Sequence, residues 1–290
     1  MPGNKSERVL KRTPIEQCLQ RCPTPELQDI LRVAAEAALA AGAVLQDLYD
    51  RPHQIRHKGT IDLVTEADLA SETVILKLLQ ERLPGIRILS EESHGANVTG
   101  PAGPSWIIDP LDGTTNFAHN FPWFAVSIAL YEQGRSQAGV IYSPMQKELF
   151  CGVRGAGAWL NDQPITVSGI AALQEALLAT GFPYDVAKRP DSILAVLREV
   201  VIRSQGVRRP GAAALDLAYL ACGRLDGFWE VGLKPWDTAA GSLLLEEAGG
   251  TLSDFRGNPF SPFTPELLAS NSLLHEELTT LLARFSSLAP

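Results

Sequence analysis

Two aspartates three residues apart, Asp109 and Asp112, are the first residues in this sequence that could do chemistry. Asp109 follows the apolar run at residues 106–108, which predicts a buried strand. We expect the strand to end there, because Pro110 interrupts strand pairing and Gly113 permits a tight turn. Both carboxylates can then point into one small volume, where they repel each other unless one is protonated or a cation binds. Oxygen ligands without His or Cys favour Mg²⁺.

A possible phosphate site follows directly. The backbone N–H groups of Gly113, Thr114 and Thr115 come at the expected start of a helix, and helix N-termini bind phosphate groups. Carboxylate ligands and a phosphate-binding turn within seven residues indicate phosphoryl-transfer chemistry.

Two further acidic segments also lie at the ends of expected elements. Glu91 and Glu92 follow the strand expected at residues 86–89, and Asp237 begins a helix. Each acid also has a plain structural explanation. Asp112 can be a turn residue, Asp237 a helix-start carboxylate that the helix dipole stabilises, and Glu91–Glu92 a solvated loop.

Hydrophobic periodicity and turn residues predict mixed helices and strands. Helices are expected at residues 25–49, 66–83, 191–203, 212–222, 238–248 and 265–284, and strands at 86–89, 106–109, 124–131, 138–142, 148–153, 164–167, 177–180, 227–230 and 251–253. The order lacks strict strand–helix alternation, which favours an α+β layered fold. Residues 1–23 are expected to be a loosely ordered extension.

Composition narrows the class of protein. The formal net charge of −8 disfavours nucleic-acid binding. Four cysteines in 290 residues fit reduced thiols in a cytoplasmic protein better than a disulfide framework. No apolar stretch has the length of a membrane span, and the basic N-terminus lacks the apolar run of a signal peptide.

Four segments resemble the motifs of the inositol monophosphatase family. They are residues 62–68, with Asp62-Leu63-Val64-Thr65 and Asp68; residues 91–93; residues 109–117, reading DPLDGTTNF; and residues 236–241, reading WDTAAG, followed by EAGG at 247–250. The resemblance covers residues 31–282, and residues 209–230 resemble bacterial members. It implies a five-layered αβαβα sandwich, shared with fructose-1,6-bisphosphatases, in one catalytic domain at residues 24–290. It also implies a homodimer and a Mg²⁺-dependent, lithium-sensitive phosphatase.

The resemblance carries metal-binding roles onto five residues. Glu91, Asp109 and the carbonyl of Leu111 would hold the first Mg²⁺, and Asp109, Asp112 and Asp237 the second. A third, weaker Mg²⁺ would depend on Glu91 and water, so two or three ions are expected.

Catalytic and substrate roles follow in the same way. Thr114, paired with Asp68, would orient and help deprotonate the attacking water. Gly113, Thr114 and Thr115 would bind the phosphate, and Glu230 would accept hydrogen bonds from substrate hydroxyls. Lys58 is the nearest match to a lysine that assists in related enzymes.

The motifs are compatible with several phosphate esters as substrate. Thr115 and Asn116 stand where phosphoadenosine and histidinol phosphatases carry other residues, so inositol 1-phosphate is favoured and fructose 1,6-bisphosphate is the alternative. Some bacterial relatives also bind the transcription machinery, and a catalytically inactive relative is a third reading. Arg208 and Arg209 are expected to be a solvated pair, with contact to an anionic substrate or partner as the alternative.

Overall fold

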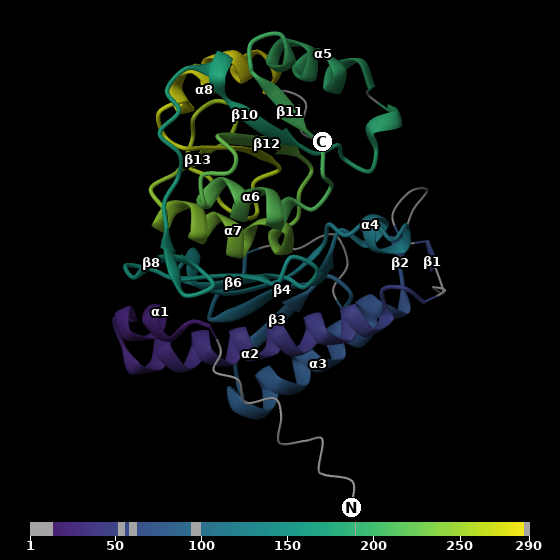
Figure 1. Cartoon of the computed structure of the whole chain (residues 1–290), viewed down its shortest axis with the longest axis vertical. Coiled ribbons are helices and arrows are strands. Elements are labelled where there is room, and N and C mark those ends of the chain that lie inside the picture. Colours follow the sequence, from purple (N-terminus) through teal and green to yellow (C-terminus); the bar gives the residue numbers. More distant parts are fainter. Residues whose placement is uncertain (1–13, 52–55, 58–62, 94–99, 189, 287–290) are drawn as a thin grey trace, which may run out of the picture.

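Five stacked layers make up the molecule (Figure 1). The computed structural model describes residues 14–51, 56–57, 63–93, 100–188 and 190–286. From bottom to top in Figure 1 the layers are helices α2 (Pro25–Leu48) and α3 (Glu66–Arg82), a seven-stranded sheet, helices α6 (Ala213–Ala221) and α7 (Pro235–Glu247), a five-stranded sheet, and helices α5 (Pro190–Val201) and α8 (His275–Leu282). The α+β fold class and the αβαβα sandwich are therefore confirmed.

The seven-stranded sheet carries Asp109 and Asp112 of the candidate site on its strand β4. Its strands, in spatial order, are β3 (Arg87–Ser90), β4 (Ser105–Asp112), β5 (Ala125–Glu132), β6 (Arg135–Ser143), β7 (Glu148–Val153), β8 (Gly157–Leu160) and β9 (Gln163–Ile165). Only the pair β3–β4 is parallel. All eight residues of β4 are buried, because helices cover both faces of the sheet.

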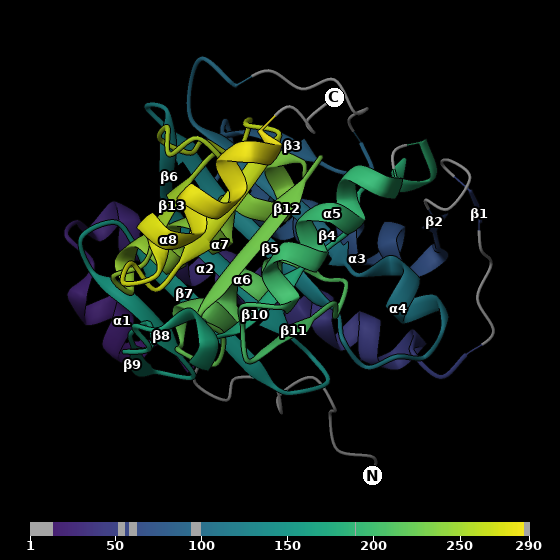
Figure 2. The same ribbon diagram turned by 90° about the horizontal axis from the view of Figure 1, so that it is seen from above.

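The five-stranded sheet has the order β11 (Gly206–Arg208), β10 (Leu177–Thr180), β12 (Gly227–Val231), β14 (Glu266–Ser270) and β13 (Thr251–Ser253). Strand β10 pairs in parallel with β11 and β12, and the other pairs are antiparallel. Seen from above (Figure 2), α5 and α8 lie over the outer face of this sheet. Their apolar side chains share one buried cluster with those of β10, β12 and β14.

Helix α2 forms because Thr24 and Pro25 mark its start. The Thr24 side chain accepts a hydrogen bond from the N–H of Leu27 at 3.2 Å, and proline suits the first helical position. One face of α2 is apolar and packs against the seven-stranded sheet. Gly42 permits this close approach, since a Cβ there would lie 2.4 Å from the Tyr142 ring.

The boundary expected for the N-terminal extension is wrong. Residues 16–21 form helix α1 (Glu16–Arg21), and Ile15 and Cys18 are fully buried in the cluster below the first sheet. The six-residue helix is too short for its periodicity to be recognised against the flanking polar residues. Residues 1–13 lie outside the described part of the chain.

Three further expectations on local structure need correction. The helix expected at residues 265–284 is strand β14 followed by α8, with a turn between them. The strand expected to end at Asp109 continues to Asp112, because a register shift against β5 accommodates Pro110. Strands β8 and β11 were not expected, and their short length and glycines explain why.

The smaller elements are β1 (Arg56–His57), β2 (Leu63–Val64), α4 (Thr114–Ala118) and the 3₁₀ turns η2 (Leu173–Glu175), η3 (Val186–Lys188) and η4 (Ala283–Phe285). Among the helices of the described residues, none combines the length and the apolar character needed to cross a membrane.

Candidate active site

The end of β4 and the turn after it place the two aspartates of the first motif. Asp109 lies opposite Ser127 of β5 and Asp112 opposite Ala125, with the register shift between them. Both carboxylates are almost completely buried, with relative exposures of 2% and 8%. Gly113 then turns the chain into α4 with a φ of 96°, which favours glycine.

The Asp109 carboxylate belongs to a group of neighbouring negative charges. Burial raises its pKa well above the usual range, and the charges of Glu91, Asp112 and Asp237 raise it further. Against this, the N–H of Leu111 donates to Oδ1 at 3.0 Å. The carboxylates of Glu91, Asp112 and Asp237, from three segments of the chain, therefore lie within electrostatic range of Asp109.

Asp112 is bound by the N-terminus of a helix from the next layer. The N–H of Ala214, in the first turn of α6, donates to its Oδ2 at 2.7 Å. Burial raises the pKa of Asp112 to about 7, while the N–H groups at the start of α6 oppose this rise. Helix α6 has no capping side chain of its own, so Asp112 supplies an acceptor across 102 residues of sequence.

Asp237 and Glu91 approach from two other elements. Asp237 lies in the first turn of α7, where its Oδ2 accepts the N–H of Lys234 at 2.7 Å. Burial raises the pKa of Asp237 well above the usual range, and the charges of Glu91 and Asp112 raise it further. The backbone N–H of Glu91 donates to the carbonyl of Ile108 at 3.1 Å, which holds the residue after β3 beside the residue that precedes Asp109 on β4.

These residues fit magnesium by their chemistry. Buried carboxylates that repel one another are stabilised by a cation, and the oxygen donors of this set suit a hard one. Within the described residues, no group of three or more His, Cys, Asp or Glu side chains forms a ready-made metal cage. Mg²⁺ does not require one, since it keeps several water ligands and commonly binds one or two carboxylates together with substrate phosphate.

Thr114 and Asp68 form a hydrogen-bonded pair beside this group. The Thr114 hydroxyl lies 2.8 Å from Oδ1 of Asp68 and 3.2 Å from the carbonyl of Leu111. Asp68 is 1% exposed, and its Oδ2 accepts both the N–H and the hydroxyl of Thr65 at 2.7 Å. The Thr-x-x-Asp capping pattern at the start of α3 fixes the Asp68 carboxylate toward Thr114.

Glu230 lies on β12 at the boundary of the second sheet. Burial raises its pKa to about 8, Arg209 lowers it and Asp112 raises it. Gly181 gives the carboxylate its space, because a Cβ there would overlap Glu230. Glu230 is therefore close enough to sense the charge of Asp112, although it comes from a different layer.

Two supporting features were not anticipated. One is the contact of the α6 N-terminus with Asp112. The other is Asn116, whose Nδ2 donates to the carbonyls of Trp123, Pro210 and Gly211. No local pattern indicated either contact, since the partners are far apart in sequence. Asp62 and Lys58 lie outside the described residues.

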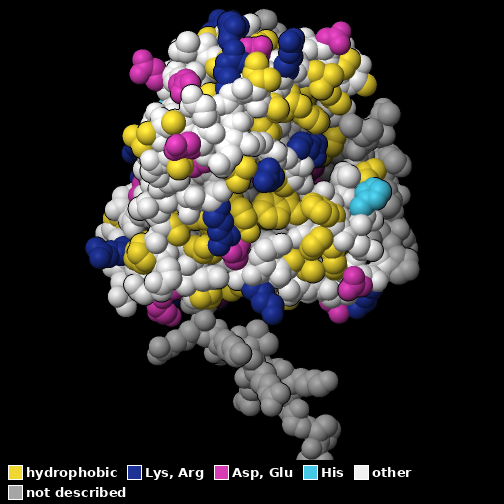
Figure 3. Space-filling model, turned by 45° about the horizontal axis from the view of Figure 1, so that its top comes forward, with side chains coloured by type: hydrophobic (Ala, Val, Ile, Leu, Met, Phe, Trp, Pro, Cys, Tyr) yellow, Lys and Arg dark blue, Asp and Glu magenta, His cyan; other side chains and the backbone are white. Residues whose placement is uncertain are grey.

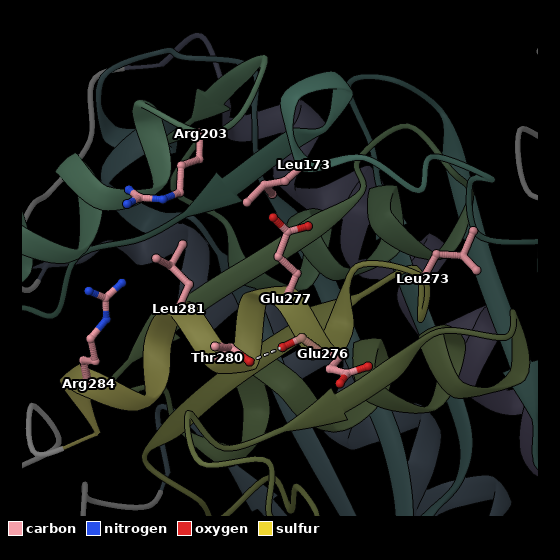
Figure 4. A pocket seen from close by; sticks show the side chains of 8 residues that line it. All are labelled: Leu173, Arg203, Leu273, Glu276, Glu277, Thr280, Leu281 and Arg284. Atoms are coloured by element: carbon pink, nitrogen blue, oxygen red, sulfur yellow. Dashed lines mark hydrogen bonds between the residues drawn. The ribbon is translucent and has the colours of Figure 1, made fainter.

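A wide hollow on the surface lies away from these residues. It measures about 690 Å³ and is lined by residues of α8, η4 and the loops around them, including Arg203, Glu277 and Leu281 (Figure 4). It contains none of the residues that the motifs selected. On the face drawn in Figure 3, Lys and Arg side chains lie in separate spots rather than in one continuous basic patch.

Known proteins resemble this arrangement over nearly the whole chain. The sequence profile of the Inositol monophosphatase family matches residues 26–287. The chain belongs to the inositol monophosphatase family. It is a phosphatase of that family, and the sequence resemblance is confirmed.

Individual relatives show how close this likeness is. An inositol-1-monophosphatase of Synechocystis is 46% identical over 260 residues, which are 89% of this chain and 90% of the relative. The Nus factor SuhB of Escherichia coli is 42% identical over 247 residues, covering 84% and 92%. A solved inositol monophosphatase from Anabaena superposes with a TM-score of 0.81 at 46% identity, covering 89% of this chain and 97% of that one.

Proposed function

We propose that this protein hydrolyses the phosphate monoester of a small polyol, inositol 1-phosphate, with Mg²⁺ as cofactor. The observation that carries the proposal is the convergence of Asp109 and Asp112 of β4 with Asp237 of α7, since burial raises the pKa of all three and the charges of Asp112 and Asp237 raise that of Asp109 further. The family and the name of the Synechocystis relative support the same activity.

Five residues would hold the metal. We assign Glu91, Asp109 and the carbonyl of Leu111 to one Mg²⁺, and Asp109, Asp112 and Asp237 to a second. A third ion would bind at Glu91 with water. When bound, Mg²⁺ supplies positive charge to the phosphate oxygens and lowers the pKa of a bound water. Inhibition by lithium is expected if Li⁺ replaces the second ion.

Thr114 and Asp68 would prepare the attacking water. The Thr114 hydroxyl donates to Asp68, so its oxygen lone pairs are directed away and can accept a hydrogen bond from the water. Asp68 can take up the proton that Thr114 relays, because Thr65 holds the carboxylate in place. The water would attack phosphorus in line with the leaving alkoxide, and no covalent phosphoenzyme forms.

Backbone N–H groups and Glu230 would hold the two ends of the substrate. The N–H groups of Gly113, Thr114 and Thr115 are assigned to the phosphate oxygens. Glu230 is assigned to the hydroxyls of the polyol. An ionised carboxylate can only accept hydrogen bonds from these hydroxyls, whereas a protonated carboxyl group can also donate one.

The substrate assignment is tested by assaying four compounds side by side with Mg²⁺. These are inositol 1-phosphate, fructose 1,6-bisphosphate, histidinol phosphate and 3′-phosphoadenosine 5′-phosphate. We expect inositol 1-phosphate to be hydrolysed with the highest kcat/KM. If inositol 1-phosphate is the poorest of the four, the substrate assignment is wrong. If none of the four is hydrolysed in a Mg²⁺-dependent way, the proposed activity itself is wrong.

A second role, binding to the transcription machinery, is favoured by the relatives named Nus factor SuhB. Capture of RNA polymerase or its elongation factors by the tagged protein tests it. Capture that persists in Asp109→Asn supports a role independent of catalysis, and no enrichment over a tag-only control excludes the role.

Nucleic acid itself is not proposed as a partner. A cytoplasmic homodimer is proposed from the family, and sedimentation of the purified chain tests the dimer.

A further inference from the structure

Asn116 of α4 contacts three backbone carbonyls that belong to two other parts of the chain. Its Nδ2 donates to the carbonyl of Trp123 at 2.8 Å, to that of Pro210 at 2.9 Å and to that of Gly211 at 3.3 Å. All three neighbours are acceptors, so the amide nitrogen and not the oxygen must face them. One side chain thus joins the segment before β5 to the turn before α6.

The same two segments also lie against the backbone of Gly113. A Cβ on Gly113 would lie 3.0 Å from the carbonyl oxygen of Trp123 and 3.4 Å from the Cβ of Ala212. The spacing between Trp123 and the turn before α6 therefore determines where the backbone of Gly113 lies. Asn116 fixes that spacing, because its amide donates to both segments.

The turn before α6 also affects how Asp112 is held. The N–H of Ala214, three residues after Gly211, donates to Oδ2 of Asp112 at 2.7 Å. A Cβ on Gly211 would lie 3.5 Å from Nδ2 of Asn116 and 2.5 Å from Nη1 of Arg209, so both side chains lie close to its backbone. A displacement of this turn would move the α6 amides relative to Asp112. Asn116 therefore connects the turn assigned to the phosphate with a carboxylate assigned to the metal.

Helix α4 cannot maintain this arrangement by itself. It has five residues, fewer than an isolated helix needs to be stable. Phe117 anchors it to the first-layer cluster, where its ring centroid lies 5.7 Å from that of Tyr49 and 5.0 Å from that of Phe124. Asn116, the residue before it, anchors α4 to the turn that leads into the middle layer.

From these contacts we propose that Asn116 is a positioning residue of the reaction, whose amide sets the distance between the phosphate-binding turn and the start of α6. The inference rests on the proposed function and deepens it, because it names the side chain that aligns the backbone amides at residues 113–115 with Asp112. Asn116 acts through the backbone of Gly113 and through Asp112, without contact to the substrate.

Asn116→Leu tests the inference, since leucine has the same branched shape as asparagine but cannot donate a hydrogen bond. Misplaced amides should slow the attack on phosphorus more than they weaken substrate binding. We expect kcat for inositol 1-phosphate to fall about 100-fold, the effect of a displacement of about 1 Å, and KM to change by less than about threefold. Asn116→Ala should give the same result, which excludes crowding by the leucine side chain as the cause.

A second measurement does not depend on activity. Hydrogen exchange followed by mass spectrometry, on the full-length protein in EDTA, reports local opening of the peptides that cover residues 113–118 and 211–216. In both Asn116 variants the two segments should exchange at least about tenfold faster than in the wild-type protein, because one amide holds both.

Asn271 provides the matched control. It is 2% exposed, and its Nδ2 also joins distant segments by donating to the carbonyl of Ile170 at 2.7 Å and to Oγ of Ser168 at 2.9 Å. It follows the end of β14 that pairs with the start of β12, whereas Glu230 lies near the other end of β12. Asn271→Ala should lower the melting temperature, keep kcat and KM within about twofold, and leave exchange of the two segments unchanged.

Four results would overturn the inference. They are a wild-type kcat in the Asn116 variants, a rise in KM with kcat unchanged, an equal loss of kcat in Asn271→Ala, and faster exchange at residues 113–118 alone. The last would show that Asn116 supports only its own helix. Each is distinguishable from failure of the proposed function, which is an absence of Mg²⁺-dependent inositol 1-phosphate hydrolysis by the wild-type protein.

Discussion

Burial destabilises the ionised form of the Asp112 carboxylate, and hydrogen bonds from a helix of the next layer stabilise it. Burial alone would favour its neutral form, and the charge of Glu91 adds to this effect. The N–H groups at the start of α6 offset part of that cost by donating to the charged form. A residue buried in this way is poorly placed for stability and well placed to bind a cation.

Replacing Asp112 or Asp237 by Asn should nearly abolish turnover without unfolding the protein. Each change removes one negative charge from a crowded group, which relieves repulsion in the metal-free state but weakens metal binding. We expect kcat to fall by about 10³-fold, equivalent to about 4 kcal/mol. Steady-state assays, circular dichroism and Mg²⁺ titration calorimetry measure this.

Asp47→Asn is the control for this change, since Asp47 is exposed on α2 and forms a salt bridge with Arg51 at 2.7 Å. It should keep wild-type kcat. Wild-type turnover in Asp112→Asn would contradict the assigned role.

The raised pKa of Asp112 predicts how the metal-free protein responds to pH. The pKa of Asp112 is about 7 in the folded protein, against 3.8 for an ordinary aspartate, so the folded protein binds the proton more tightly than the unfolded chain. The contribution of Asp112 to stability is therefore fully present below about pH 4 and is lost as the pH rises through about 7.

Thermal melting in EDTA should show this loss. From pH 4 to 7.5 the melting temperature of wild-type protein should fall relative to that of Asp112→Asn, by at least about 3 °C. Excess Mg²⁺ should raise the melting temperature of the wild-type protein more than that of the variant. Melting curves that change in parallel with pH would show that Asp112 is not the group responsible.

At the scale of elements, α1 extends the fold beyond the residues that resemble the family. Ile15 and Cys18 are fully buried below the seven-stranded sheet, against α2 and strands β7 and β8. The N–H of Gln17 also donates to Asp162 at 2.6 Å, which ties α1 to the turn between β8 and β9. A segment of six helical residues thus owes its structure to packing, since it is too short to be stable alone.

Truncating Ile15 should destabilise the protein and leave the site intact. Ile15→Ala removes buried methyl groups and leaves a cavity, so we expect the free energy of unfolding to fall by about 2–4 kcal/mol. Urea denaturation measures the change. Gln20→Ala, at an exposed position on the same helix, should change it by less than about 0.5 kcal/mol. Equal effects of the two variants would show that α1 does not pack as described.

At the scale of the whole molecule, helices α6 and α7 form the layer that lies between the two sheets (Figure 1). Helix α6 binds Asp112 through its N-terminus and α7 carries Asp237. The two helices pack closely because position 241 has no side chain, and a Cβ there would lie 2.6 Å from the Cβ of Leu217. Spacing within this layer therefore determines how the acidic residues of different layers meet.

Gly241→Ala should disturb stability and metal binding together. The added methyl group forces α6 and α7 apart, at a cost of about 1–3 kcal/mol. We expect a lower melting temperature and a higher Mg²⁺ concentration for half-maximal activity. Gly169→Ala is the control, since a Cβ at Gly169 meets no atom within 4 Å. A Gly241→Ala protein with unchanged Mg²⁺ dependence would show that the layer spacing does not control the site.

Local signals in the sequence were sufficient for most elements of the fold. Thr24 and Pro25 predicted the start of α2, and apolar runs predicted β5, β7 and β10 at nearly the observed positions. The spacing of Asp109 and Asp112, followed by Gly113, predicted the chemistry of the site. These features depend on capping, periodicity and turn conformation, which act over a few residues and are therefore visible in the sequence.

Tertiary structure decided the rest, because the contacts concerned join distant residues. The apolar residues of β14 have no period that separates a short strand from a helix, and pairing with β12 and β13 settles the matter. Burial of α1, the α6 amides on Asp112 and the position of Arg209 over Gly211 have no local signature either. The sequence by itself selected the carboxylates that we assign to magnesium, and only packing between layers decided which distant groups support and surround them.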